Sequence, residues 1–216
     1  MRKLFVFALA ALLTAPLLAQ QHQADHDKKV VGGGTLPSGW KGRLDETEAS
    51  MSGVKVMLMG TGIHFTTGPA GIYYRPTDRK TGVYEAHATF NQLEPAAHPE
   101  AYGLFIGGSD LEAAGQKYTY FLIRQDGKFL VKRRAGAATP NVMDWTGNAA
   151  IKKAEAGGKM ANTMAIAVGQ DKVRFLVNGT EVTSIEPSKV DANGIAGLRV
   201  NHSLTLLVEG FAVTAR

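Results

Sequence analysis

The chain has 216 residues, 44% of them hydrophobic, and a formal net charge of +5. It contains no cysteine, which excludes a disulfide framework and a lipid anchor on an N-terminal cysteine. The length suits one substantial domain, and the densest basic cluster is the short run at 132–134, so the charge pattern does not indicate nucleic-acid binding.

The first residues have the pattern of a secretory signal peptide. Arg2 and Lys3 form a positive head, an apolar run follows from Leu4 to Leu13, and Ala19 is a small residue before the expected cut. The run is too short for a spanning helix. We therefore expect a signal peptide over 1–19, export to the periplasm or the medium, no membrane span, and a mature charge of about +3 once Arg2 and Lys3 are removed.

Residues 20–36 are polar and end in a glycine run, which predicts a flexible leader. From residue 37 to the end at 216, short apolar runs alternate with Gly, Pro, Asn and Asp, the residues of tight turns. The expected strands are 54–60, 62–68, 71–75, 82–93, 102–108, 118–124, 128–134, 163–169, 172–178, 180–185, 194–200 and 204–214. Many short strands without intervening helices predict an all-β fold, an antiparallel two-sheet β-sandwich.

Two of the turns repeat one pattern, an apolar strand, a polar-Gly pair and a second strand. Asp126-Gly127 and Asn178-Gly179 supply the positive φ angles that tight hairpins need. The strand over 118–124 is apolar on both faces, as expected where the outer face of a sheet is partly covered. The simplest arrangement has two central hairpins, one in each sheet.

The second half of the chain resembles a known superfamily. Trp145 and Ile151 are followed by "NTMAIAVGQDKVRFLVNGTEV", by "GIAGLRV" and by a terminal strand "LTLLVEGFAVT". This order is similar to that of the concanavalin A-like lectin/glucanase superfamily, the jelly roll of laminin-G-like domains. More loosely it resembles exported bacterial 3-keto-disaccharide hydrolases. The resemblance implies a jelly roll over roughly residues 71–214 and a carbohydrate or polysaccharide partner.

One signature of the superfamily is missing. Its retaining glucanases carry a Glu-x-Asp-x-(x)-Glu strand, whose two glutamates act as nucleophile and acid. The nearest acidic cluster, Asp45 to Glu48, has no Glu-x-Asp and lies in a polar segment that is predicted to be a solvated loop. That enzyme class is excluded.

Glu85 and His87 form the best candidate catalytic pair. Alternation places Tyr84 and Phe90 on the core side of their strand, so Glu85 and His87 share the other face. A carboxylate beside an imidazole can orient a general base. The alternative is an ordinary exposed strand face.

Tyr118, Tyr120 and Arg124 share one face by alternation, with Arg133 expected opposite them on the paired strand. Aromatic rings stack on sugars and guanidinium groups bind hydroxyls or carboxylates, so these four residues are the candidate carbohydrate ligands. The alternative is sheet packing with the tyrosine tips reaching water.

Asp110 and Glu112 lie in a Gly-flanked loop and are the candidate metal ligands. Loop carboxylates hold calcium with help from backbone carbonyls, and such ions occur in the superfamily, although the spacing is not that of an EF-hand. A structural calcium is thus one possibility, and no other cofactor is indicated.

The leading functional hypothesis is a secreted, non-catalytic, lectin-like carbohydrate-binding protein. The alternatives are a glycoside or keto-disaccharide hydrolase that uses Glu85 and His87, and an interaction module without a small ligand. The sequence leaves open whether the protein is an enzyme.

Overall fold

The computed structural model describes residues 29–31, 33–96, 98–155 and 157–216. Their strands form two antiparallel sheets of seven strands each, which confirms the predicted β-sandwich. The predicted signal peptide 1–19 and the first part of the leader 20–36 lie outside the described residues. No helix in the described part of the chain is long and apolar enough to cross a membrane.

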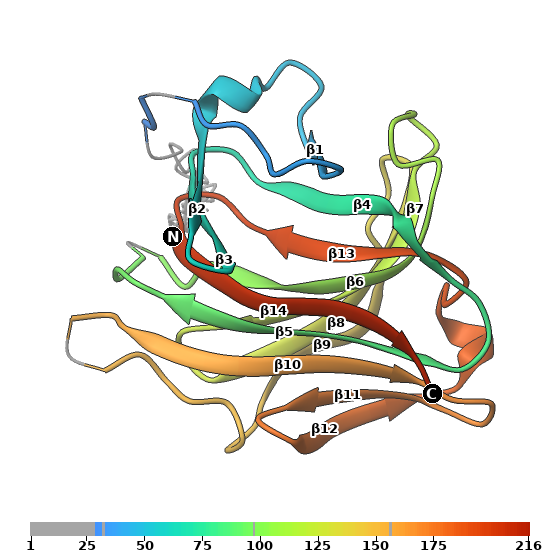
Figure 1. The fold of residues 1–216 in the computed structure, drawn as a ribbon. Helices are drawn as coiled ribbons and strands as arrows, with labels where there is room; N and C mark the ends of the chain where they lie inside the picture. Colours follow the sequence, from blue (N-terminus) through green and yellow to red (C-terminus); the bar gives the residue numbers. More distant parts are fainter. Residues whose placement is uncertain (1–28, 32, 97, 156) are drawn as a thin grey trace, which may run out of the picture.

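Sheet A has the strand order β1-β4-β13-β6-β7-β8-β9 (Figure 1). Its strands are β1 (Lys41–Leu44), β4 (Gly71–Lys80), β13 (Gly194–Val200), β6 (Ala101–Ser109), β7 (Lys117–Arg124), β8 (Lys128–Ala135) and β9 (Asn141–Gly147).

Sheet B has the strand order β12-β11-β10-β5-β14-β3-β2. Its strands are β12 (Thr180–Ile185), β11 (Val173–Val177), β10 (Met160–Val168), β5 (Tyr84–Gln92), β14 (Thr205–Ala215), β3 (Gly62–Thr67) and β2 (Val54–Met59). Two single-turn 3₁₀ helices, η1 (Met51–Gly53) and η2 (Pro187–Lys189), interrupt the connections.

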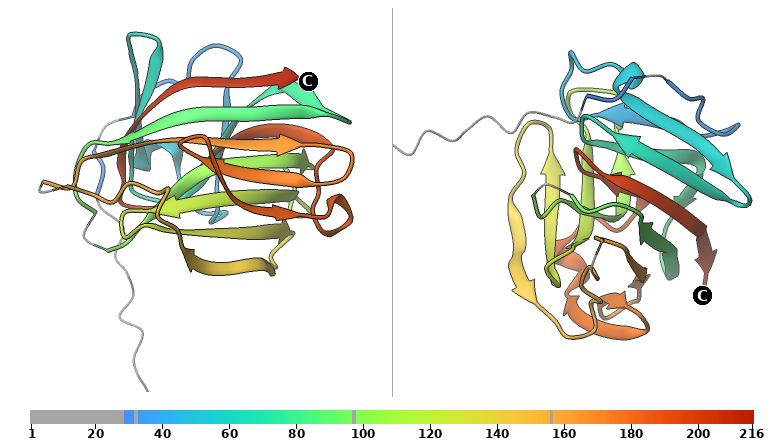
Figure 2. Two further views of the ribbon diagram at one scale, coloured as in Figure 1. Left: turned by 90° about the horizontal axis from the view of Figure 1, so that it is seen from below. Right: turned by 90° about the vertical axis from the view of Figure 1, so that its left-hand side faces the viewer.

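The two sheets face each other as layers (Figure 2) and share one apolar core. Aromatic pairs join the layers: the ring centroids of Phe90 and Tyr102 lie 5.2 Å apart, and those of Phe121 and Phe175 lie 5.3 Å apart. Such pairs stabilise a core beyond their buried area by about 0.5–1.5 kcal/mol each. The sandwich is therefore held by the inward side chains of both sheets.

The two predicted hairpins form, one in each sheet. Asn178 and Gly179 have φ angles of 51° and 81°, the left-handed conformation that this tight turn requires. In the other turn only Gly127, with a φ of 83°, has this conformation, and Asp126 does not, which corrects the prediction for Asp126. The expectation that both hairpins are central is wrong for the second one, because β12 is the edge strand of sheet B.

Candidate functional site

The outer face of sheet A, the side turned away from sheet B, carries a second apolar cluster. In β7, Phe121 and Ile123 belong to the shared core, whereas Tyr118 and Tyr120 belong to the outer cluster. The buried members of the outer cluster are Ile72, Tyr74, Ala101, Phe105, Leu111, Tyr118, Tyr120, Leu122, Leu130 and Ile195. As the sequence predicted, β7 is apolar on both faces because its outer face is also covered.

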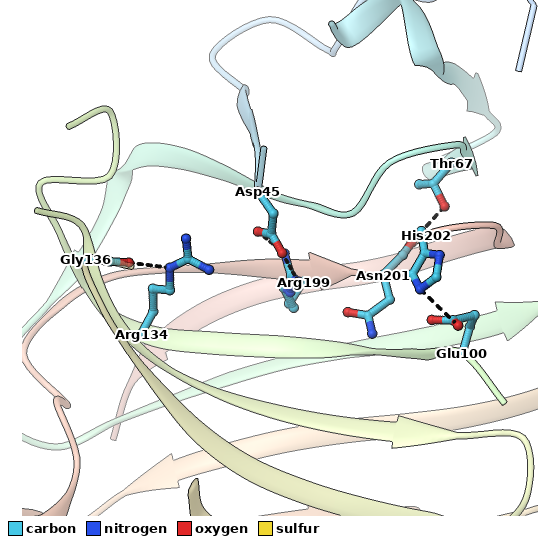
Figure 3. A network of polar contacts seen from close by, with 8 residues as sticks. All are labelled: Asp45, Thr67, Glu100, Arg134, Gly136, Arg199, Asn201 and His202. Carbon is cyan, nitrogen blue, oxygen red and sulfur yellow. Dashed lines mark hydrogen bonds and ion pairs between the residues drawn. The ribbon is translucent and has the colours of Figure 1, made fainter. Parts of the chain in front are cut away.

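An ion pair between Arg199 and Asp45 lies on this outer face (Figure 3). Nη1 and Nη2 of Arg199 donate to Oδ1 and Oδ2 of Asp45 at 2.7 and 2.5 Å. Arg199 is only 7% exposed, and its guanidinium carbon lies 5.9 Å from the ring centroid of Tyr120. Burial alone would lower the pKa of Arg199, but the adjacent Asp45 carboxylate outweighs it and raises that pKa above its usual range.

The polar sequence around Asp45 predicts a solvated loop, and this prediction is wrong because the Asp45 carboxylate is paired with the buried Arg199. Arg199 is a single charged residue in an otherwise apolar strand, "GIAGLRV", and a charge in a buried strand requires a partner. That signal predicts an ion pair. It does not reveal the partner, because Asp45 is 154 residues away in the chain.

The phenols of Tyr118 and Tyr120 lie beside this ion pair. Burial raises the pKa of Tyr118, and it raises the pKa of Tyr120 to about 12, although the positive charge of Arg199 opposes both shifts. Both side chains are therefore neutral phenols at physiological pH. Their ring faces are packed, with the Tyr118 and Tyr120 centroids 5.6 Å apart and Phe105 5.2 Å from Tyr118. The rings form a packed layer that is almost fully buried, with Tyr118 1% exposed and Tyr120 7% exposed.

Basic side chains gather around the two phenols. The strand register places Arg134 opposite Tyr118 and Lys132 opposite Tyr120. Nε of Arg134 donates to the Gly136 carbonyl at 2.6 Å. From β1, Arg43 donates to the carbonyls of Leu111 and Ala113 at 2.7 and 2.6 Å. Among the described residues, Arg43, Lys132 and Arg134 have no carboxylate partner, so positive charge is in excess on this face.

A groove of about 430 Å³ opens on the same side of the molecule, near β1 and β4. It is lined by Lys41, Tyr74, Pro76, Arg79, Asp110, Leu111, Glu112, Ala113 and Ile195.

The predicted metal ligands Asp110 and Glu112 both line this groove. Glu112 accepts a hydrogen bond of 2.5 Å from Nζ of Lys41, which lowers the pKa of its carboxyl. Asp110 has a φ of 51° and lies in the turn after β6. No group of three or more metal-ligating His, Cys, Asp or Glu side chains occurs in the described residues. The calcium site therefore stays a prediction, and Lys41 already engages one of its two proposed ligands.

The other two predicted carbohydrate ligands, Arg124 and Arg133, lie on opposite faces of sheet A. Arg124 lies on the outer face, where its guanidinium carbon is 4.3 Å from the ring centroid of Trp145 and its Nε donates to Asp126 at 2.8 Å. Arg133 was expected on this face, but the register pairs it with Thr119, which points the other way. Its guanidinium instead donates to the Asp191 carboxylate. The neighbouring Arg134 is the residue that shares a face with Tyr118.

Trp145 on β9 is a half-buried aromatic residue that the site prediction omitted. It packs against the outer cluster, and the Arg124 guanidinium lies over its ring in a cation–π contact. β9 has a mixed, weakly apolar sequence, which is why no strand was predicted there.

Glu85 and His87 share a face as predicted, but it is the outer face of sheet B. Nδ1 of His87 lies 3.5 Å from Oε1 of Glu85, and the other Glu85 oxygen contacts the guanidinium of Arg216. The pair therefore exists, on the sheet opposite to the tyrosine and arginine residues.

No protein-family model matches the chain, and no curated protein matches its sequence. Solved structures do share its fold. A carbohydrate-binding module, CBM66 of Bacillus subtilis, matches with a TM-score of 0.60 and 11% identity over 82% of this chain and 96% of the module. A family 7 alginate lyase in complex with product matches with a TM-score of 0.53 and 11% identity over 82% of this chain and 95% of the lyase.

A third structure is a GH16 protein of a mixed-linkage glucan locus of Bacteroides ovatus, in complex with product. It matches with a TM-score of 0.54 and 10% identity over 81% of this chain and 94% of that protein. The chain shares the jelly-roll fold of these three proteins. This confirms the fold that the sequence resemblance implied, while function has to be argued from the site.

Proposed function

We propose that the protein is an exported, non-catalytic carbohydrate-binding protein, and that the outer face of sheet A is its binding surface. The observation that carries the proposal is the polar cluster of Arg199, Asp45, Tyr118 and Tyr120 on that face. Buried charged groups are costly and concentrate where they serve a function. Here the cluster lies among uncompensated basic side chains and near a groove.

The chemistry of the cluster favours binding over catalysis. Glycoside hydrolysis ordinarily requires two carboxyl groups that flank the scissile bond. Asp45, the carboxylate of this cluster, has both oxygens bonded to Arg199. The raised pKa of Tyr118 and of Tyr120 keeps these side chains protonated, so neither acts as a base near neutral pH. What the surface offers is hydrogen-bonding groups for hydroxyls and positive charge.

The fold supports the same proposal. A carbohydrate-binding module and two enzymes captured with their products share this jelly roll. The signal-peptide pattern over 1–19 supports the proposal that the protein is exported. Export would bring the protein into contact with extracellular polysaccharides.

The two tryptophans of the chain give a direct test. Trp145 packs against the outer cluster of sheet A, whereas Trp40 packs against the shared core, 5.4 Å from the Phe211 ring. In W40F, which retains Trp145, a bound polysaccharide should change the tryptophan emission. In W145F, which retains Trp40, the emission should stay constant. A glycan array without enrichment of the wild-type protein, on neutral and acidic glycans alike, would refute the proposal.

The second candidate function is a hydrolase that uses Glu85 and His87, and the 3.5 Å contact between them favours it. Its test is product release from a panel of glycosides and keto-disaccharides. Release that is abolished by E85Q would support the hydrolase. No release from any substrate would leave the binding proposal in place.

A further inference from the structure

Arg134, near the end of β8 on the proposed surface, has hydrogen-bond donors that no residue in the described part of the chain uses. Its Nε donates to the Gly136 carbonyl (Figure 3). Its two terminal nitrogens have no hydrogen-bond or ion-pair partner among the described residues. The side chain is half-buried, which limits the entropy lost when a ligand binds. Lys132, two residues earlier on the same face of β8, likewise has no carboxylate partner there.

Three guanidinium groups converge on this region and one carboxylate opposes them. Arg199, Arg134 and Arg43 all lower the pKa of the Tyr118 phenol through their charge, and Asp45 raises it. Arg199 is neutralised by Asp45, whereas Arg43 and Arg134 bond only to backbone carbonyls. A region with this excess of positive charge favours an anionic group and attracts it from solution.

The same face already binds carboxylates of its own chain. Arg199 binds Asp45, Arg124 binds Asp126 and Lys41 binds Glu112. A planar guanidinium fork matches a carboxylate in two parallel hydrogen bonds, as Arg199 and Asp45 show. The terminal nitrogens of Arg134 offer the same fork to a carboxylate from outside.

We propose that the ligand is a carboxylate-bearing glycan, and that Arg134 and Lys132 bind a sugar carboxylate. This inference rests on the proposed function and narrows the ligand to glycans that contain carboxylated sugars, of which uronic acids are the test case. Positive charge at Arg43 extends the surface toward the groove near β1 and β4. A polymer with repeated carboxylates therefore fits the surface better than a neutral glycan does.

The test compares a polyuronate with the same polymer after its carboxylates have been reduced to hydroxymethyl groups. Isothermal titration calorimetry of the full mature chain should show binding to the polyuronate and at least tenfold weaker binding to the reduced polymer. Hydrogen bonds to charged groups are strong, so R134Q and K132Q should each weaken polyuronate binding by about tenfold to a hundredfold. Affinity should also fall as salt is raised.

The matched controls lie on sheet B. Arg174 in β11 contacts Asp171 and Glu181, and Lys55 is exposed on β2. R174Q and K55Q remove the same charges from the molecule and should leave the affinity unchanged. Thermal unfolding of each variant confirms that it is folded.

The outcomes separate the two proposals. Equal binding of the polyuronate and its reduced form would overturn the carboxylate inference and leave the carbohydrate-binding function intact. Equal binding of a sulfated glycan of the same charge density would also overturn it, because charge alone would then suffice. Equal losses of polyuronate affinity in R134Q and R174Q would show that the binding site is not on the outer face of sheet A. If no glycan binds at all, the proposed function fails together with the inference.

Discussion

Arg199 and Asp45 form a bidentate ion pair on the outer face of sheet A, although 154 residues separate them in the chain. The pair joins the segment after the edge strand β1 to the interior strand β13. Asp45 is 27% exposed and Arg199 only 9% at their side chains, so solvent screens this pair less than it screens the other ion pairs on this face. It anchors the N-terminal part of the domain and shapes the proposed binding surface.

D45N should destabilise the protein strongly. The variant leaves the buried guanidinium of Arg199 without a counter-charge, and breaking a buried pair in this way costs about 3–5 kcal/mol. The partial exposure of Asp45 favours the lower end of that range. Urea denaturation measures the effect. E112Q, which removes a carboxylate from the exposed pair with Lys41, is the control and should change little. A loss below about 1 kcal/mol in D45N, as for a surface pair, would contradict this account.

The tyrosines should titrate abnormally in the folded protein. All six tyrosines of the chain have a raised pKa because they are buried, and that of Tyr120 is about 12. Folding therefore favours the protonated phenols. The stability that this provides is complete below pH 10, the pKa of an unfolded tyrosine, and for Tyr120 it is lost as the pH rises through about 12.

Ultraviolet absorbance of the phenolate measures this titration. The native protein should show little phenolate at pH 10.5, whereas the same protein in guanidinium chloride should titrate with a midpoint near 10. A native midpoint near 10 would mean that the tyrosine tips are open to water.

The loss of stability on replacing Asn178 should depend on which residue replaces it. Its φ is 51°, and its side chain bonds to the Thr163 amide, the Ala150 carbonyl and Asn162. N178A loses these bonds and also strains the backbone, which for an ordinary residue costs about 1–2 kcal/mol. N178G loses the same hydrogen bonds, but glycine adopts a positive φ without strain. Urea denaturation should therefore give N178A a lower free energy of unfolding than N178G. Equal values would show that the turn changes conformation to accommodate alanine without strain.

The strand pattern of the sandwich was predictable because alternation and turn residues are local signals. The strand at 194–200 was predicted at its observed bounds, and Tyr84, Phe90 and Phe175 are buried as expected. The two strands that were missed, β1 and β9, lie at the two edges of sheet A. β1 and β9 bury few side chains, so their sequences carry little periodicity.

The candidate site was predictable only in part. Tyr118, Tyr120 and Arg124 share the outer face because alternation within one strand fixes their direction. Arg133 was misplaced by one residue, since the register between β7 and β8 decides which side chain faces Tyr118. Asp45 was missed because its contact with Arg199 is long-range, and no local pattern encodes such a contact.

Hydrogen exchange measured with and without a bound glycan tests the central claim, that the outer face of sheet A is the binding surface. Added protection should concentrate in β7 and β8, at residues 117–135, and in the segment around Asp45. Peptides from β10 and β11, residues 160–177 in sheet B, should exchange at unchanged rates. Protection confined to sheet B, around Glu85 and His87, would show that the outer face of sheet A is not the binding surface.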